Sequence, residues 1–224
     1  MSAVELYEAM RCAPTSRRFT DEPVDPAALG RALDAARFAP SGGNRQGWRV
    51  VVVTDPQARR ALRDLYLPHW RAYLELTGGA QMLARPEAFD ERRTRMVQRA
   101  NEYAERLHEV PVHLVLGVRI ADLAVTDEAL PRTSIVGGAS IYPFAQNLLL
   151  ALRNEGLGAS MTTLLVPAEA EVRELLGIPQ EVALAAHVGV GHRADPWPKQ
   201  LSRKPVEEFA FSERFGEPFR PPTS

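Results

Sequence analysis

The 224-residue sequence predicts one α+β domain that carries a helical surface insertion and an extended C-terminal arm. Three observations support this fold class. Helical periodicities alternate with short apolar, β-branched runs along most of the chain. The chain has no internal repeat and no low-complexity tract. From Asp195 onward it is largely polar, with three prolines among the last seven residues. We therefore expect this tail to lie across another surface.

The first part of the chain alternates helices with one strand. Residues 4–10 show an apolar helical face and predict a short helix. Asp25 provides a capping carboxylate and Pro26 fits the first turn, which together predict the start of a second helix. The run WRVVVVTD at residues 48–55 is typical of a strand buried on both faces, and a third helix follows through residues 61–65.

The second part continues this alternation after a charged stretch. Residues 77–109 are dense in charge and predict an exposed helical excursion, followed by a strand at residues 112–118. Residues 137–155 form the most apolar helical pattern, which belongs either in a core or between subunits. The sequences ASMTTLLV, AEAEVRELLG and VALAAHVGVG then predict a strand, a helix and a final strand.

Composition excludes several classes of function. The sequence contains no run of eighteen apolar residues, the length needed to span a bilayer. Its net charge of -1 gives no overall field that would attract nucleic acid or an anionic membrane. Cys12 is the only cysteine, which excludes a disulfide framework and Cys-rich zinc sites. Because the first twenty residues also lack an apolar signal core, we expect a cytoplasmic protein.

Three motif-like features favour ordinary structural interpretations. The segment GVGHRA at residues 189–194 fits a dinucleotide-binding pattern, but the following Asp-Pro-Trp-Pro cannot open a helix, so glycines that end a strand are favoured. The five histidines show no zinc-binding spacing, and no metal site is predicted. Ser140 and Ser160 lie near glycines but not in a nucleophile elbow, so no catalytic side chain is predicted.

Two segments have the chemistry of a ligand site. In TSRRFTDEPV, Arg17 and Arg18 stand just before a helix, next to the hydroxyls of Thr15 and Ser16, and forked guanidinium donors beside hydroxyls suit a phosphate monoester. A solvated Arg-Arg pair is the competing interpretation. In APSGGNRQGW, the polar Ser41, Asn44 and Gln46 surround two glycines that would let a ligand approach the backbone, although a plain connecting loop is equally compatible.

These segments belong to an ordered set that resembles the FMN-dependent nitroreductase family. The set comprises SRRFTDEPV, ARFAPSGGNRQGWRVVVV, GASIYPFAQNLLLALRNEGLGAS with MTTLL after it, and LSRKPVEEF near the end. It leaves only about residues 70–110 unmatched. The Ser-Met-Thr-Thr-Leu stretch is more similar to the branch of flavin-destructase and iodotyrosine-deiodinase relatives than to the enteric nitroreductases.

The resemblance implies a single domain over residues 1–224, with a variable helical insertion at about 70–110 and an arm at about 195–224. It implies a mixed central sheet flanked by helices, and a homodimer in which the arm wraps the partner. It also implies two FMN sites at the dimer interface. The residues that it assigns to the cofactor are Thr15, Arg17, Ser41, Gly42, Asn44, Gln46, Ser160, Met161, Thr162, Thr163 and Arg203.

Within that set, the resemblance gives Arg17 and Arg203 to the FMN phosphate, while Ser41, Gly42 and Asn44 would come from the other subunit. Ala13, Pro14 and Leu201 replace residues that are usually basic in the family. The implied reaction takes a hydride from NADH or NADPH and reduces a small organic acceptor, such as a nitroaromatic or quinone, by ping-pong exchange. Two alternatives remain open, namely a flavin-binding or sequestering protein without turnover and an oxidative flavin-processing enzyme.

Overall fold

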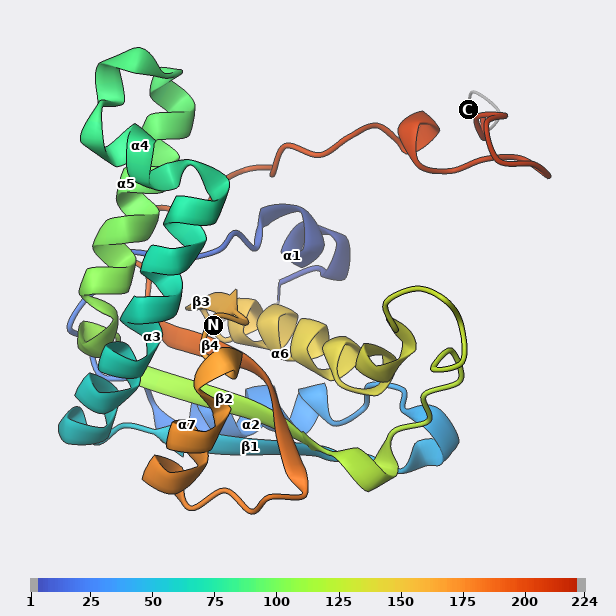
Figure 1. The fold of residues 1–224 in the computed structure, drawn as a ribbon, viewed down its shortest axis with the longest axis horizontal. Helices are drawn as coiled ribbons and strands as arrows, with labels where there is room; N and C mark the ends of the chain where they lie inside the picture. The colour runs from blue at the N-terminus through green and yellow to red at the C-terminus, as the bar shows by residue number, and fades with distance from the viewer. Residues whose placement is uncertain (1–3, 221–224) are drawn as a thin grey trace.

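The computed structural model describes residues 4–220, which fold into one antiparallel sheet with helices on both faces (Figure 1). The strands are β1 (Trp48–Val53), β2 (Val112–Arg119), β3 (Leu157–Thr162) and β4 (Val182–His192). The helices are α1 (Leu6–Cys12), α2 (Pro26–Ala36), α3 (Pro56–Thr77), α4 (Gly79–Ala84), α5 (Glu91–Glu105), α6 (Tyr142–Asn154) and α7 (Glu169–Leu176). The α+β class and every helix and strand predicted above are therefore confirmed.

The sheet has the strand order β1-β2-β4-β3, and all neighbouring pairs run antiparallel. The expectation of a mixed sheet is wrong for the described residues. The excursion between β1 and β2 explains the orientation of that pair. It leaves the sheet along α3 and returns along α5 to the end at which it left, where Val53 pairs with His113. The second strand must then run back beside the first.

Two apolar layers hold the sheet. On one face, the buried residues of α2 and α6 pack against alternate residues of β2 and β4, such as Leu114 and Val188. On the other face, α3, α5 and α7 pack around Val115 and Val53. The apolar helix α6 contributes Leu148 and Leu152 to the first core, with neither residue exposed. The core position expected for this helix is therefore confirmed.

Two predictions of burial were wrong. Strand β1 lies at the edge of the sheet and pairs only with β2, so Val53 is its one buried residue and Val52 is 45% exposed. The charged excursion is helical as predicted, but its inner side is not exposed. Tyr103, Ala104 and Leu107 are buried against α3 because widely spaced apolar residues suffice to form a helical stripe.

The C-terminal arm leaves the body after β4 and extends away from it (Figure 1). Its root is fixed by Trp197, whose ring lies under the guanidinium carbons of Arg153, at 4.0 Å, and Arg193, at 4.7 Å. Farther along, the arm carries Phe209 and Phe215, which are 63% and 93% exposed. An extended segment that exposes large apolar side chains is unusual unless another surface covers them.

Candidate ligand-binding site

A cavity of about 510 Å³ lies between the end of β3 and the helices α3, α4 and α5. Six of the predicted site residues line it together: Thr15, Arg17, Ser160, Met161, Thr162 and Thr163. The opposite wall is aromatic and apolar and comes mainly from the excursion, where Tyr66, Trp70 and Tyr73 lie on α3. The cavity therefore combines hydroxyl groups and one guanidinium on one side with aromatic rings on the other. This composition is typical of small-molecule and cofactor sites.

The segment carrying Thr15 and Arg17 is held beside β3 like an additional short strand. Thr15 pairs with Ala159 as an isolated parallel bridge, and the Ser16 amide donates a hydrogen bond of 2.8 Å to the Ala159 carbonyl. The side chain of Ser16 is buried and accepts a bond of 2.6 Å from Arg193. Because side chains alternate in an extended segment, burying Ser16 turns Thr15 and Arg17 toward the cavity.

The two adjacent arginines have different surroundings. Arg18 forms an ion pair of 3.0 Å with Asp195, at the start of the arm. Arg17 is half-buried, lines the cavity, and makes no ion pair or side-chain hydrogen bond with another residue of the described chain. The guanidinium of Arg17 thus remains available to a bound anion, whereas that of Arg18 is already engaged.

Two tyrosines that the sequence reasoning missed also belong to the cavity. The Tyr103 hydroxyl is buried and makes no hydrogen bond within residues 4–220. Burial raises the pKa of Tyr103. Burial likewise raises the pKa of Tyr66, against the smaller influence of Thr162 and Arg17. Both tyrosines therefore stay protonated at neutral pH and present hydroxyl donors. Tyr103 falls within the charged stretch of residues 77–109, where an isolated aromatic residue could have drawn attention to it, and Tyr66 precedes that stretch.

The remaining predicted loop residues lie at the start of β1. The Ser41 hydroxyl accepts a hydrogen bond of 3.0 Å from the Gln46 amide, and the Gln46 side chain donates to Asn44 Oδ1 at 3.1 Å. The Gly42 amide donates to the Ser140 hydroxyl at 3.0 Å. Asn44 and Gln46 have positive φ angles of 53° and 51°, which a non-glycine residue adopts only where its surroundings require it.

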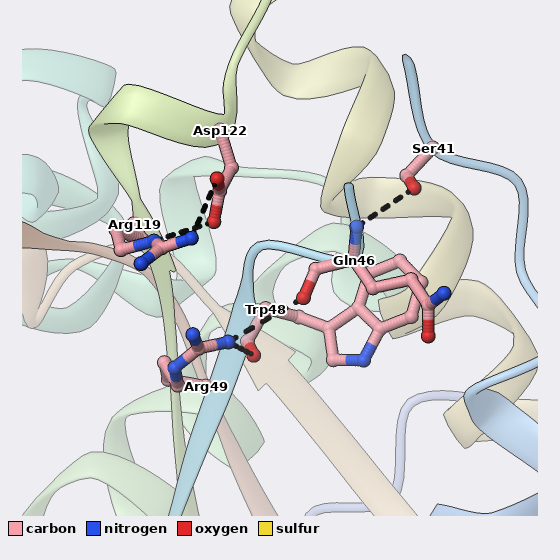
Figure 2. A network of polar contacts seen from close by, with 6 residues as sticks. All are labelled: Ser41, Gln46, Trp48, Arg49, Arg119 and Asp122. Atoms are coloured by element: carbon pink, nitrogen blue, oxygen red, sulfur yellow. Dashed lines mark hydrogen bonds and ion pairs between the residues drawn. The ribbon is translucent and has the colours of Figure 1, made fainter. Parts of the chain in front are cut away.

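The strand start beside this loop is firmly held, as Figure 2 shows. Arg49 donates to the Trp48 carbonyl at 2.7 Å. The Trp48 ring also stacks on Phe144, with centroids 5.0 Å apart. Nearby, Arg119 binds Asp122 through two hydrogen bonds of 2.6 and 2.8 Å. The loop is thus a preformed structure whose polar groups bind one another.

One chain does not bring the loop and the cavity together. Across the sheet, Ser160 of β3 pairs with Gly189 of β4, Gly189 pairs with His113 of β2, and His113 pairs with Val53 of β1. Val53 is the residue of β1 farthest from the loop. The loop and the cavity are therefore separated by the length of β1, from Val53 back to Trp48, and by the width of the sheet from β3 to β1. Together these distances amount to on the order of 20 Å. Arg203 joins neither group. It lies exposed on the arm, and within the part of the chain that the structure describes it donates only to the carbonyl of its neighbour Ser202, at 2.7 Å.

Two of the five histidines form a buried pair that no spacing in the sequence predicts. His113 Nδ1 lies 2.8 Å from His187 Nε2, and the other ring nitrogen of each has no partner within the described residues. Burial lowers the pKa of His113 well below its ordinary value and lowers that of His187 to about 4. Both rings are therefore neutral at neutral pH.

The glycines of GVGHRA lie inside β4 and do not end it, which corrects the interpretation given above. A Cβ atom on Gly189 would lie 2.5 Å from the Tyr103 hydroxyl, and one on Gly191 would lie 2.9 Å from the Phe19 ring. The glycines therefore admit neighbouring side chains onto the sheet. Within residues 4–220, no group of three or more His, Cys, Asp or Glu side chains could hold a metal ion. In the same range, no helix has the length and apolar character needed to cross a membrane.

Comparison with known proteins identifies the family. A sequence model described as the Nitroreductase family matches residues 14–192. The chain therefore belongs to the nitroreductase family, as its motifs predicted. It is 32% identical over 184 residues to an NADH dehydrogenase from Thermus thermophilus, covering 80% of this chain and 82% of that protein. It is 29% identical over 194 residues to an iodotyrosine deiodinase from Thermotoga neapolitana, covering 87% and 91%.

A further relative matches most of the chain, and two solved structures share its fold. The chain is 29% identical over 218 residues to a 5,6-dimethylbenzimidazole synthase from Rhodospirillum rubrum, covering 92% of this chain and 85% of that protein. The fold is similar to that of an FMN- and NADPH-dependent nitroreductase from a Sphigopyxis strain, with a TM-score of 0.68, 22% identity, and coverage of 95% and 100%. It is also similar to an iodotyrosine deiodinase bound to FMN and 3-iodo-L-tyrosine, with a TM-score of 0.65, 24% identity, and coverage of 93% and 100%.

Proposed function

We propose that this protein is an FMN-dependent oxidoreductase that takes a hydride from NADH or NADPH and reduces a small organic acceptor. The observation that carries the proposal is the meeting of Thr15, Arg17 and residues 160–163 in one cavity with an aromatic wall. Segments from distant parts of the sequence converge there, and all of them were assigned to the cofactor by family resemblance. The relatives named NADH dehydrogenase and FMN- and NADPH-dependent nitroreductase support the same chemistry.

The residues present fit a flavin. The volume of about 510 Å³ lies within the range of cofactor pockets. The buried Tyr103 hydroxyl lacks a partner in the described chain, as expected of a group that donates to a ligand. Arg17 provides a forked cation for the phosphate, with Arg203 of the arm proposed as a second one. Bound FMN would supply the hydride-transfer chemistry itself.

The residues of the chain would then bind, orient and shield the reacting groups. Ser160, Met161, Thr162 and Thr163 would lie along the pyrimidine or N5 side of the flavin. Hydroxyl groups at these positions can donate to ring oxygens and nitrogens without carrying a charge of their own. Tyr66 and Trp70 would cover the open side and exclude water from it. No side-chain acid or base is required by this proposal.

We also propose that the active form is a homodimer with two sites at its interface. The Ser41–Gln46 loop lies on the order of 20 Å from the cavity of its own chain, so it could reach a flavin only in the partner's cavity. Its preformed geometry suits such a role, because a rigid loop loses little entropy on binding. The exposed Phe209 and Phe215 on the arm support an exchange in which each arm wraps the other subunit.

A second candidate function is oxidative processing of bound flavin. The relative named 5,6-dimethylbenzimidazole synthase favours it, since it matches 92% of this chain. A protein that binds FMN without turnover is the third candidate.

The deciding experiment starts with the purified protein and identifies the cofactor that it releases. We expect a yellow protein that releases FMN and not FAD, because the site has arginines but no Gly-rich loop on a helix N-terminus for a pyrophosphate. NAD(P)H oxidation is then measured with a nitroaromatic or quinone acceptor. Absence of turnover would contradict the oxidoreductase proposal. Loss of reduced FMN under air but not under anaerobic conditions would favour the second candidate.

A further inference from the structure

The helix α5 carries its arginines in its N-terminal part. Four arginines, Arg92, Arg93, Arg95 and Arg99, lie in its first nine residues, whereas Glu102 and Glu105 lie in its last turn. The helix dipole places partial positive charge at the N-terminus and partial negative charge at the C-terminus. Arg92 and Arg93 in the first turn are therefore unfavourable there, whereas the N-cap Asp90 and Glu91 are favourable. A concentration of cations at a helix N-terminus is unfavourable by itself. A bound anion, however, would be attracted by the arginines and by the positive end of the helix dipole.

These arginines surround a hollow that adjoins the cavity. The hollow has a volume of about 610 Å³ and is lined by Arg17, Asp90, Arg92, Arg93, Arg95, Met96 and Arg99. Arg17, Arg93 and Met96 line the cavity as well, so the two spaces share a boundary. A molecule seated against the aromatic wall of the cavity could therefore extend into the hollow without crossing the protein.

The positive charge of the hollow is poorly balanced by the protein. Among the arginines of α5, only Arg95 has an ion pair within residues 4–220, with Glu91 at 3.5 Å, and both side chains are more than half exposed. The carboxylate of Asp90 accepts from the Arg93 amide at 2.9 Å and caps the helix. Arg92, Arg93 and Arg99 make no ion pair with any residue between 4 and 220. Three free guanidinium groups around one hollow are a suitable receptor for a carboxylate or phosphate.

We propose that the substrate of this site is an aromatic compound that bears an anionic group. Its ring would lie against Tyr66, Trp70 and Tyr73, and its carboxylate or phosphate would lie among Arg92, Arg93 and Arg99. This inference rests on the proposed function, since it concerns the molecule that exchanges electrons at the same cavity. Two sources share the chemistry: an aromatic acid that accepts electrons, and the 2′-phosphate that distinguishes NADPH from NADH.

The test uses the flavin-loaded protein and two matched pairs of substrates. The first pair is 4-nitrobenzoate and 4-nitrobenzamide, which differ in charge and little in shape, and the second is NADPH and NADH. In the variant R92Q/R93Q/R99Q we expect KM to rise at least about tenfold for the anionic member of one pair, with kcat little changed. The KM of its neutral or less charged counterpart should stay within about twofold. The control is R60Q, an exposed arginine of α3 that lines neither space.

The outcome identifies the source of the anion. A selective rise for 4-nitrobenzoate assigns the arginines to the acceptor, and a selective rise for NADPH assigns them to the dinucleotide. Equal changes for both members of each pair would overturn the proposal. Loss of flavin from R92Q/R93Q/R99Q would also overturn it, because the arginines would then serve the cofactor.

A binding measurement separates this proposal from the proposed function. Trp70 lines the cavity, so its fluorescence should report 4-nitrobenzoate bound to the oxidised protein without any turnover. We expect saturable quenching that weakens in the triple variant and at high salt, since exposed charges are screened. If the protein binds 4-nitrobenzoate in this way but does not oxidise NAD(P)H, the proposed function fails and the anion site remains. If the protein oxidises NAD(P)H and its affinity for 4-nitrobenzoate is the same in the wild type and the triple variant, no such site exists for an acceptor.

Discussion

The two ends of the sheet differ in whether their polar groups have hydrogen-bond partners within the described chain. At the end of β3, the cavity leaves the Tyr103 hydroxyl without a partner in the described chain and Arg17 without a counter-ion. At the start of β1, the polar groups of the Ser41–Gln46 loop bind one another and their neighbours. The cavity end is thus incomplete and ready for a ligand, whereas the loop end is already complete and rigid.

This difference shows how one site can be divided between two copies of a chain. A half-site that leaves donors unpaired needs a ligand to satisfy them. A half-site that only has to cover that ligand can be built in advance, because its own hydrogen bonds hold its shape. The comparison makes two predictions. A substitution at the cavity end should change the ligand affinity of the same chain's site, and a substitution at the loop end should change only the affinity of the partner subunit's site.

Removal of residues 201–224 should have the largest effect. The deletion removes the exposed phenylalanines of the arm together with Arg203. We expect a monomer at low micromolar concentration and loss of most bound flavin, measured by light scattering and by the visible spectrum. The variant F209S/F215S separates the two causes, because it keeps Arg203. A truncated protein that remains a flavin-loaded dimer would show that the loop end reaches its partner without the arm.

Mixing two inactive variants tests the division of the site. We expect both R17A and N44A to bind FMN poorly. If Arg17 and Asn44 serve the same flavin from different subunits, unfolding and refolding the two variants together yields hybrid dimers that each contain one intact site. Random pairing would restore roughly a quarter of the wild-type flavin sites. No recovery above the separate variants would place both residues in a site formed by one chain.

Arg17 should dominate cofactor retention at the cavity end. A charge-assisted hydrogen bond contributes roughly 1.5 to 3 kcal/mol, so R17A should weaken FMN binding by about ten- to a hundredfold. R17K should recover only part of the loss, because an ammonium group lacks the guanidinium fork. Titration of FMN into the apo proteins, followed by flavin fluorescence, measures each effect.

Arg18 is the matched control for Arg17, since it is adjacent in sequence and paired with Asp195. R18A should leave FMN affinity within about threefold of the wild type, because an exposed ion pair contributes little. Equal losses in R17A and R18A would mean that the phosphate meets a diffuse basic patch. A loss confined to R18A would show that the cavity faces the other arginine.

Local patterns in the sequence predicted more of this molecule than long-range ones. Asp25 caps α2 as predicted because a cap acts on amides two residues away. The edge position of β1 depends on which strands join the sheet, so an apolar run could not reveal it. The pair formed by His113 and His187 spans 74 residues, and no spacing rule predicts such a contact. The resemblance assigned Arg17 and residues 160–163 to one site, and they line one cavity. Tyr103 lines the same cavity but lies in the stretch of about residues 70–110 that the resemblance did not cover.

Acid should weaken the sheet beneath the cavity more than the loop end. His187 stands in register with Thr162 and has a pKa of about 4 in the folded protein. Its unfolded value is about 6.5, so the unfolded state binds the proton first as the pH falls. Stability is fully present above about pH 6.5 and is lost between that pH and about 4, with a cost of about 2 kcal/mol at pH 5.

Urea unfolding of the apo protein at pH 7.5 and pH 5 measures this loss. H187N should show a smaller difference between the two pH values than the wild type, whatever its stability at pH 7.5. H69N removes a histidine outside the buried pair and serves as the control. If H187N and H69N keep the same pH dependence as the wild type, the acid sensitivity comes from other groups.

The smallest effect concerns the Tyr103 hydroxyl and should have opposite signs in the free and bound proteins. Without ligand, this buried hydroxyl has no partner in the described chain, and it occupies the space that a Cβ on Gly189 would need. Y103F removes an unpaired polar group at almost constant volume, so it should stabilise the apo protein by about 1 kcal/mol. The same change should weaken FMN binding by about fivefold if the hydroxyl donates to the ligand.

The control for this crossover is Tyr73, which lines the same cavity and is 45% exposed. Its hydroxyl can bind water in the free protein, so Y73F should change apo stability by less than about 0.5 kcal/mol. Thermal unfolding of both apo variants and FMN titrations of both give the four values needed. If Y103F destabilises the apo protein and leaves FMN affinity unchanged, the hydroxyl is satisfied by the protein itself or by a buried water. The cavity end would then be as complete as the loop end, and the comparison between them would fail.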